Sequence, residues 1–138
     1  MDATVITQAT GLRIWPTHSI VAYLVRGSKV HVAFDRPPFA PSFTPASLTV
    51  SDDYDNGRYR KTAVFSVPET SEAVSNRFLT LLKTYIMIVY TDGRGVDRVM
   101  GGPQWPASLS FERSGGSLKV TVEAWGDAPN HEYVGPGS

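Results

Sequence analysis

The three histidines of this sequence are its first candidates for chemistry, because imidazole serves both as a general base and as a metal ligand. His18 follows Pro16 at the expected edge of a strand, His31 lies on the polar side of an expected strand, and His131 lies near the end of the sequence. No cysteine is present, which excludes disulfides, thiolate metal sites and cysteine nucleophiles. Three isolated histidines without thiolates predict neither a metal site nor a cofactor.

The motifs of other catalytic chemistries are missing from the sequence as well. It has no G-x-S-x-G nucleophile elbow, and Gly93 and Gly95 lie in an expected hairpin turn, where no helix N-terminus would face a phosphate. None of the 13 Asp and Glu residues stands in an apolar run that would raise its pKa. Asp52, Asp53 and Asp55 lack the Glu and the flanking helices of a calcium-binding EF-hand. We therefore expect a protein that is not an enzyme, and we identify no small-molecule substrate.

Five aromatic residues are the candidates for an interaction site. They are Phe39, Phe43, Trp105, Trp125 and Tyr133. Trp105 lies in a loop flanked by prolines, and Trp125 lies on the polar-facing side of the last expected strand. Exposed rings at such positions can stack sugars or anchor a protein partner. The other interpretation, which stays open, is that each tryptophan covers an open end of the fold.

The elements that must position these residues are short apolar stretches separated by turns. The 12 Gly and 10 Pro fall mostly between those stretches, which is typical of an all-β domain. Residues 19–25 and 30–34 predict one hairpin, and residues 48–67 predict a second around Asn56-Gly57, a dipeptide that tolerates positive φ. Residues 109–124 predict a third hairpin, whose strict alternation of apolar and polar side chains indicates one buried face.

Residues 71–83 are the one good helix candidate. Apolar side chains recur there at helical spacing and predict a buried stripe that packs against a sheet. The residues of this stripe are Val74, Phe78, Leu81 and Leu82. Residues 85–91 follow and are apolar on both alternating sets, which indicates a central strand covered on two sides, with the helix as the cover for one of them.

Together these elements predict a mainly β protein, namely an antiparallel β-sandwich or partly closed β-barrel of about eight or nine short strands with one flanking helix. The 138 residues are enough for one domain with its own core. We place this single domain at residues 1–125. Residues 126–138 lose all periodicity and predict a flexible C-terminal tail. Residues 35–47 carry four prolines and predict a long loop, either functional or a stiff crossover between two sheets, which Phe39 and Phe43 could pack down.

Charge and hydropathy limit the partners and the location. The 13 Lys and Arg are balanced by 13 Asp and Glu, so no nucleic acid partner is expected. The longest apolar stretch, residues 85–90, is far shorter than the roughly 20 residues that cross a bilayer, so no membrane association is expected either. The first residues lack the basic and apolar regions of a signal peptide, which predicts synthesis in the cytoplasm without secretion.

One part of the chain carries a recognisable combination of motifs. Its elements are an apolar strand, Y-T-D-G-x-G over residues 90–95, an Arg on the return strand, a Gly-Pro loop and a hairpin that reads L-S-F-E-R-S-G-G. With these elements residues 85–126 resemble small proteins encoded in the tail-morphogenesis regions of prophages. The resemblance implies a β-barrel or β-sandwich with one flanking helix, no catalytic residues, and incorporation in a virion as a tail or neck component.

Two functions from different classes follow. The resemblance implies a non-enzymatic structural protein that acts through protein–protein contacts, as a homo-oligomer, with other tail proteins, or with both. Its contacts would be exposed strand edges, residues 35–47 and residues 126–138. The alternative is a monomeric recognition module that binds a glycan or a peptide through its loop aromatics. An assembly protein should expose an apolar edge or patch, whereas a recognition module should show a concave aromatic site.

Overall fold

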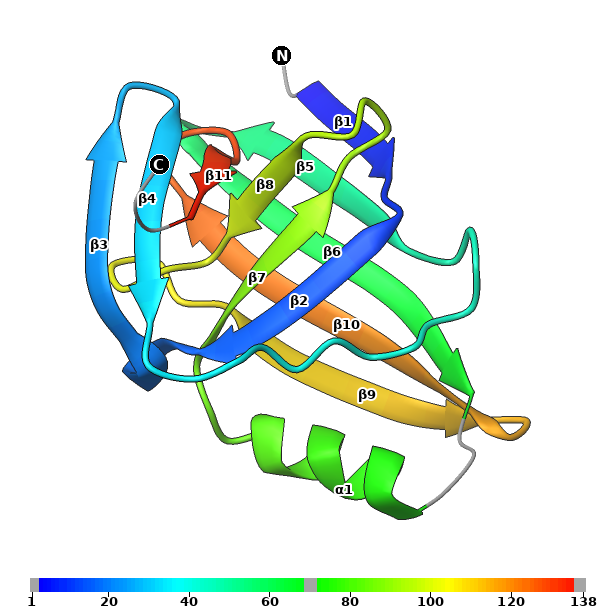
Figure 1. Cartoon of the computed structure of the whole chain (residues 1–138). Helices are drawn as coiled ribbons and strands as arrows, with labels where there is room; N and C mark the ends of the chain where they lie inside the picture. Colours follow the sequence, from blue (N-terminus) through cyan, green and yellow to red (C-terminus); the bar gives the residue numbers. More distant parts are fainter. Residues whose placement is uncertain (1–2, 69–71, 136–138) are drawn as a thin grey trace.

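The computed structural model describes residues 3–68 and 72–135, which form two β-sheets and one α-helix (Figure 1). The first sheet has five strands, in the order β1 (Ala3–Gln8), β5 (Thr49–Asp55), β6 (Arg58–Pro68), β10 (Ser117–Gly126) and β9 (Ser108–Ser114). The second sheet has six, in the order β2 (Gly11–Pro16), β7 (Ile86–Thr91), β8 (Asp97–Met100), β11 (Glu132–Val134), β4 (Lys29–Phe34) and β3 (Ile20–Arg26). Helix α1 spans Glu72–Leu81, and a 3-10 turn, Thr17–Ser19, joins β2 to β3.

This architecture confirms the predicted β-sandwich with one flanking helix, and neither sheet closes into a barrel. The described residues form eleven strands instead of the predicted eight or nine. Part of the excess is β11, whose three residues are too few to show a period along the sequence. The described part of the chain contains no helix with the length and hydrophobicity that crossing a bilayer requires.

The main core fills the space between the two sheets. Its strands present apolar side chains at every second position, as the sequence of residues 109–124 predicted. In the β9–β10 hairpin, for example, Leu109 lies opposite Val122 and Phe111 opposite Val120. The fully buried residues of this core include Ala63, Phe65, Ile86, Ile88, Met100, Leu118, Val120 and Val122.

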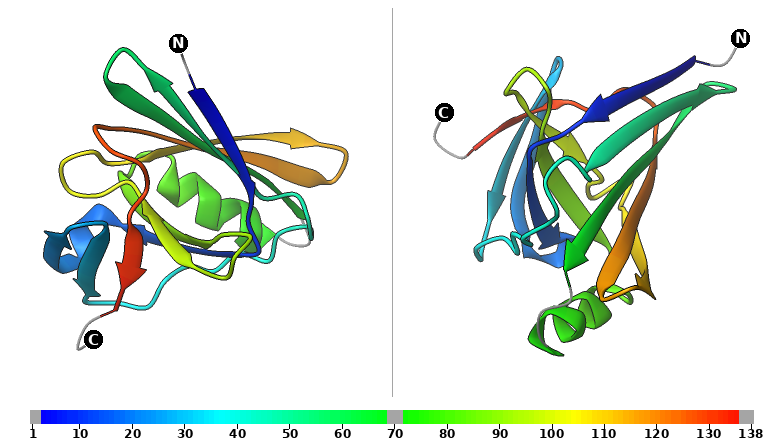
Figure 2. Two further views of the ribbon diagram at one scale, coloured as in Figure 1. Left: turned by 90° about the horizontal axis from the view of Figure 1, so that it is seen from above. Right: turned by 90° about the vertical axis from the view of Figure 1, so that its right-hand side faces the viewer.

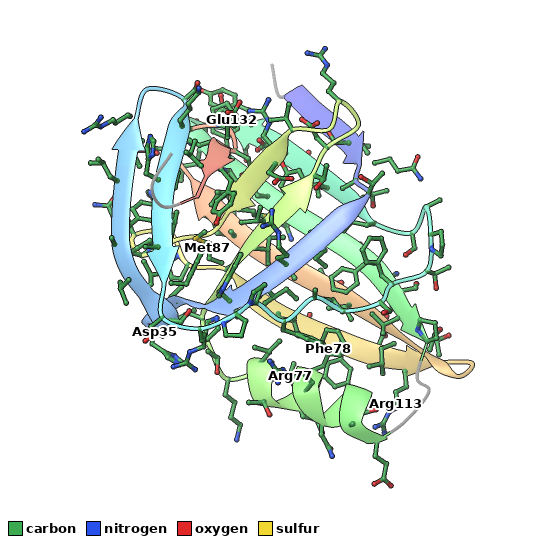
Figure 3. All side chains as sticks on the ribbon, viewed as in Figure 1. Asp35, Arg77, Phe78, Met87, Arg113 and Glu132 are labelled. Atoms are coloured by element: carbon green, nitrogen blue, oxygen red, sulfur yellow. The ribbon has the colours of Figure 1, made fainter. Side chains whose placement is uncertain are left out.

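Helix α1 closes one end of the main core, where it lies across the ends of the sheets (Figure 2). Phe78 is fully buried on the side of the helix that faces the sheets (Figure 3). The centroid of its ring lies 5.3 Å from that of Phe39, 6.3 Å from that of Phe65 and 6.2 Å from that of Phe111. One aromatic side chain thus connects the helix to the first sheet, through Phe65 and Phe111, and to the segment between β4 and β5, through Phe39.

The buried face of α1 is narrower than the sequence predicted. Leu81 is buried, but the prediction that Leu82 belongs to the same stripe is wrong, because the helix ends at Leu81 and Leu82 lies exposed beyond its last turn. The side chain of Val74 and the expected first residue of the helix, Ser71, lie outside the part of the chain that the structure describes.

A second, smaller core lies on the other face of the six-stranded sheet. Strand β7 is the boundary between the two cores, since Ile86 and Ile88 face the main core whereas Met87 and Val89 face the second. The prediction of a central strand covered on two sides is therefore confirmed. The cover on the second face comes from the same sheet, whose curl brings Val30 and Val32 of β4 into one cluster with Met87 and Val89. The buried residues of the second core are Trp15, Val30, Val32, Met87, Val89 and Val99.

For residues 132–134 the structure corrects the prediction of a flexible tail over residues 126–138, of which residues 136–138 lie outside the described part of the chain. Residues 132–134 form β11, which lies between β8 and β4 and runs parallel to β4. The ring of Tyr133 packs against the second core, and the guanidinium of Arg13 lies 5.2 Å above it while donating a 2.9 Å hydrogen bond to Asp97. Backbone hydrogen bonds and the packing of the Tyr133 ring hold these residues in the sheet. Because neither interaction requires alternating apolar and polar residues, the sequence gives no sign of this strand.

Residues 35–47 form a crossover from β4 in the second sheet to β5 in the first, as one of the two interpretations predicted. Phe39 exchanges two backbone hydrogen bonds with Ile14, of 2.8 and 2.9 Å, so the segment covers the free edge of β2. Both Phe39 and Phe43 pack against the main core, as expected, with Phe43 at 6.2 Å from the ring of Phe65.

Gly101 provides a test of how tightly β7 is held at its start. Its φ is +88°, and a Cβ at this position would lie 2.8 Å from the carbonyl oxygen of Ile86, which accepts a hydrogen bond from Ala107. Gly57 has nearly the same φ, +85°, with nothing within 4 Å of a Cβ. We expect Gly101→Ala to lower the free energy of unfolding in urea by about 1–3 kcal/mol more than Gly57→Ala does. Equal losses would contradict the steric argument.

The contacts of Phe78 predict that helix docking depends mainly on this residue. Phe78→Ala should lower the free energy of unfolding by about 3–5 kcal/mol, because it leaves a cavity among three other rings. The control is Leu79→Ala on the exposed side of the same helix, for which a change within about 0.5 kcal/mol is expected. Urea unfolding followed by tryptophan fluorescence measures both. Similar values for the two variants would show that the helix is not anchored through Phe78.

Candidate functional site

A hollow of about 320 Å³ lies where β3, the end of β10 and the loop after β8 come together. Its side walls are aromatic and its polar groups carry charges of both signs. We call it the aromatic pocket and define it by Tyr23, Lys61, Gln104, Trp105, Trp125, Asp127 and His131. At this size it belongs to the small end of the range of roughly 300–1,000 Å³ that is typical of ligand sites.

Three separate elements position the aromatic rings of this pocket. Trp125 points away from the main core at the end of β10, because its neighbours Ala124 and Gly126 occupy the buried positions of the strand. Trp105 comes from the irregular segment between β8 and β9, and Tyr23 from the middle of β3. The exposed fractions of Tyr23, Trp105 and Trp125 are 37, 38 and 45%, so each ring keeps a face open to solvent.

Lys61 is the polar residue that the sequence did not single out. It lies on the inner face of β6, opposite Asp52 of β5 and Ala124 of β10, and only 7% of its surface is exposed. Among the described residues no hydrogen bond or ion pair reaches its ammonium group. Burial lowers the pKa of Lys61 below the ordinary 10.5, although the negative charges of Asp52 and Asp127 oppose the shift. The pocket therefore contains a donor without a partner.

A second, shallower hollow of about 740 Å³ lies beside the first sheet's β5 and the β7–β8 turn. Asn130 donates a 2.7 Å hydrogen bond to the Tyr90 hydroxyl there, while the Oδ1 atoms of Asp52 and Asn130 are buried without a partner. Burial raises the pKa of the Asp52 carboxyl, although the Lys61 charge opposes the shift. Arg98 donates to Asp92 at 3.3 Å and is thus already paired. Metal binding has no support here, since the described residues offer no group of three or more suitable ligands.

The most exposed apolar feature is strand β3, one edge of the six-stranded sheet. Residues 21–25 carry no charge, and the exposed fractions of Val21, Tyr23, Leu24 and Val25 lie between 37 and 63%. One side of this strand pairs with β4, and the other side has no strand neighbour among the described residues. Natural edge strands are usually protected by charges, bulges or a covering loop. On β3 the register shift lies at its first residues, 20–22, and residues 23–25 carry neither a charge nor a bulge.

The structure separates the five predicted interaction residues into two groups. Trp105 and Trp125 come together in the aromatic pocket. Phe39, Phe43 and Tyr133 instead place their rings against the chain's own cores. The sequence could not indicate Tyr23 or Lys61, because each stands in an ordinary strand pattern and becomes a pocket residue only through the curl of the second sheet.

Comparison of the chain with models of protein families, with curated proteins and with solved structures finds no match. The arguments for function therefore rest on two surfaces of the molecule itself. One is the free apolar edge of β3, and the other is the aromatic pocket, to which Tyr23 and Val25 of the same strand contribute.

The buried position of Lys61 predicts how its substitution changes the free energy of unfolding at different pH values. Lys61→Met should raise the free energy of unfolding at pH 7, because it deletes a buried charge without a partner and keeps an apolar side chain of similar length. The pKa of Lys61 is lower in the folded chain, so its contribution to stability is full above pH 10.5 and is lost as the pH falls through the folded-state pKa. The gain from the substitution should therefore be largest near neutral pH and shrink as the pH rises toward 10.5.

Urea unfolding at a series of pH values measures this gain. Lys119→Met is the matched control, since Lys119 lies exposed on the outer face of β10, and its effect should stay within about 0.5 kcal/mol at every pH. A Lys61→Met variant that is less stable than the wild type at pH 7 would mean that the ammonium is stabilised by the fold.

Proposed function

We propose that this protein is a non-enzymatic structural protein that assembles through protein–protein contacts, as a component of a phage tail or neck. The observation that carries the proposal is the uncharged, exposed edge of β3. A row of unpaired backbone N–H and C=O groups with apolar side chains around it is a template for pairing with another chain. The motifs of residues 85–126, which resemble those of prophage tail-region proteins, supply β7 to β10 of this framework.

The partner that fits this edge best is a second copy of the chain, with the two β3 strands antiparallel. Most charges at the two ends of the β3–β4 hairpin are compensated within one copy, since Lys29 pairs with Glu132 at 3.9 Å and Asp35 pairs with Arg36 at 3.2 Å. Arg26, at the tip, has no such partner among the described residues. An antiparallel pair places the two Arg26 side chains at opposite ends of the contact, whereas a parallel pair would place these like charges together, which costs free energy.

The other edges of the two sheets are less suited to such pairing. The edge of β2 is covered by the bridge between Ile14 and Phe39. Strand β9 ends in the charged residues Glu112 and Arg113. Among the side chains of β1 that the structure describes, residues 6–8, Ile6 is the one large apolar side chain that is exposed, and a threonine and a glutamine follow it. β3 is thus the edge on which an apolar contact can extend along the strand.

Light scattering on a sizing column, over a wide range of concentration, tests the proposal. The mass of the wild-type protein should rise above that of the monomer as the concentration increases. The double variant Val21→Lys, Leu24→Lys should stay monomeric, because it places charges on the apolar edge. Both side chains are exposed and neither lines the aromatic pocket. Leu79→Lys, at an equally exposed position on α1, is the control that should associate like the wild type. A strictly monomeric wild type, or association that survives the double substitution, contradicts self-assembly through β3.

A second candidate function, ligand recognition, is favoured by a different observation. Trp105 and Trp125, which lie 20 positions apart in the sequence, line one concave site together with polar side chains. A concave site with aromatic walls and convergent polar groups is the form that small-molecule recognition takes.

A further inference from the structure

We infer that the aromatic pocket binds an uncharged saccharide, held between exposed aromatic faces and hydrogen-bonded by the ammonium of Lys61. The inference rests on the second candidate function, ligand recognition, for which it names the class of ligand. It does not depend on assembly through β3. It rests on the aromatic walls, on the unpartnered lysine at their base, and on the mixed charges of the remaining polar groups.

The aromatic walls suit the faces of a sugar ring, which present C–H groups. Tyr23, Trp105 and Trp125 each keep more than a third of their surface exposed although they line a common hollow. Ring faces of this kind form favourable contacts with flat ligand surfaces, and Trp and Tyr are the residues most often used for them. A purely apolar ligand would satisfy the walls but would leave Lys61 without a partner, at the free-energy cost of an unpaired buried charge.

The mixed charges of the polar groups favour an uncharged ligand over a strongly charged one. Lys61 and Asp127 both line the pocket, and the distance between them is too long for an ion pair, so neither neutralises the other by direct contact. An anionic ligand would approach the Asp127 carboxylate, and a cationic ligand would approach the Lys61 ammonium. Hydroxyl groups both donate and accept, so one polyhydroxylated ligand can accept from Lys61 and donate to Asp127. Gln104 and His131 add further donors and acceptors.

Glycines keep this pocket open at the points where its polar groups lie. A Cβ on Gly126 would lie 3.1 Å from Lys61 Nζ, and a Cβ on Gly102 would lie 3.0 Å from the Tyr23 hydroxyl oxygen. A larger residue at either position would push the polar tip of its neighbour aside. Glycine where a ligand or a polar tip approaches the backbone closely is typical of binding sites in strands.

Two-dimensional ¹H–¹⁵N NMR of the full chain tests the inference without any substitution, because the three tryptophans provide three indole N–H signals. The probes are maltose, cellobiose and N,N′-diacetylchitobiose, each titrated to millimolar concentration. The signals of Trp105 and Trp125 should shift with at least one of them. The signal of Trp15 should stay in place, because its indole N–H donates to the Arg36 carbonyl oxygen at 3.1 Å inside the second core.

Variants then assign the binding to the pocket. Trp105→Ala and Lys61→Met should each weaken binding of the active disaccharide roughly tenfold or more, whereas Tyr85→Ala, an exposed aromatic outside the pocket, should leave it unchanged. Because Lys61→Met is expected to stabilise the fold, its loss of binding cannot come from unfolding. The inference is overturned if a peptide or a charged sugar shifts the indole signals and none of the three probes does. It is also overturned if binding survives both pocket variants. These outcomes are independent of the β3 variants, since Val21 and Leu24 lie outside the pocket.

Discussion

The fold depends on one constraint, which is that β7 must be buried on both faces. Ile86 and Ile88 need the first sheet and α1 as their cover, and Met87 and Val89 need a second cover on the opposite side. A flat six-stranded sheet would leave the second pair exposed, at a cost of roughly 1.5–3 kcal/mol for each large side chain. The sheet therefore curls until β4 lies over β7, and the face-to-face stack of Trp15 on Phe34, with ring centroids 3.9 Å apart, closes the second core.

The two candidate functional surfaces are consequences of this curl. Strand β3 follows β4 in the sheet but extends past the second core, so most of its side chains find nothing to cover and remain exposed. The same curl brings Tyr23 and Val25 of β3 toward the end of β10 and the segment of Trp105, which forms the aromatic pocket. The edge proposed for assembly and the walls proposed for saccharide binding thus share one strand: Val21 and Leu24 belong to the edge alone, whereas Tyr23 and Val25 belong to both.

The sequence predicts what local patterns determine. The alternation of the β9–β10 hairpin, the Asn56-Gly57 turn and the two apolar sets of β7 each require a specific local structure, and each is found. The features that the sequence does not predict are those that depend on contacts between distant segments of the chain. Leu82 fits the helical stripe, yet the helix ends before it. Trp105 and Trp125 could be singled out as aromatic candidates, but Lys61 looks like any polar residue of a hairpin until its burial beside them is known.

The place of β11 has a consequence for how the chain is made. Glu132 pairs with Lys29, about a hundred residues earlier in the sequence, and β11 is the strand through which β4 and β3 join β2, β7 and β8 in one sheet. During synthesis β4 emerges about a hundred residues before this shared neighbour and β8 about thirty residues before it, so the second sheet stays incomplete until residues 132–134 have been made. Contacts of such long sequence separation also slow folding. The nascent chain therefore exposes the edges of β4 and β8 for a time, a period in which a chaperone or a premature partner strand has its best opportunity to bind.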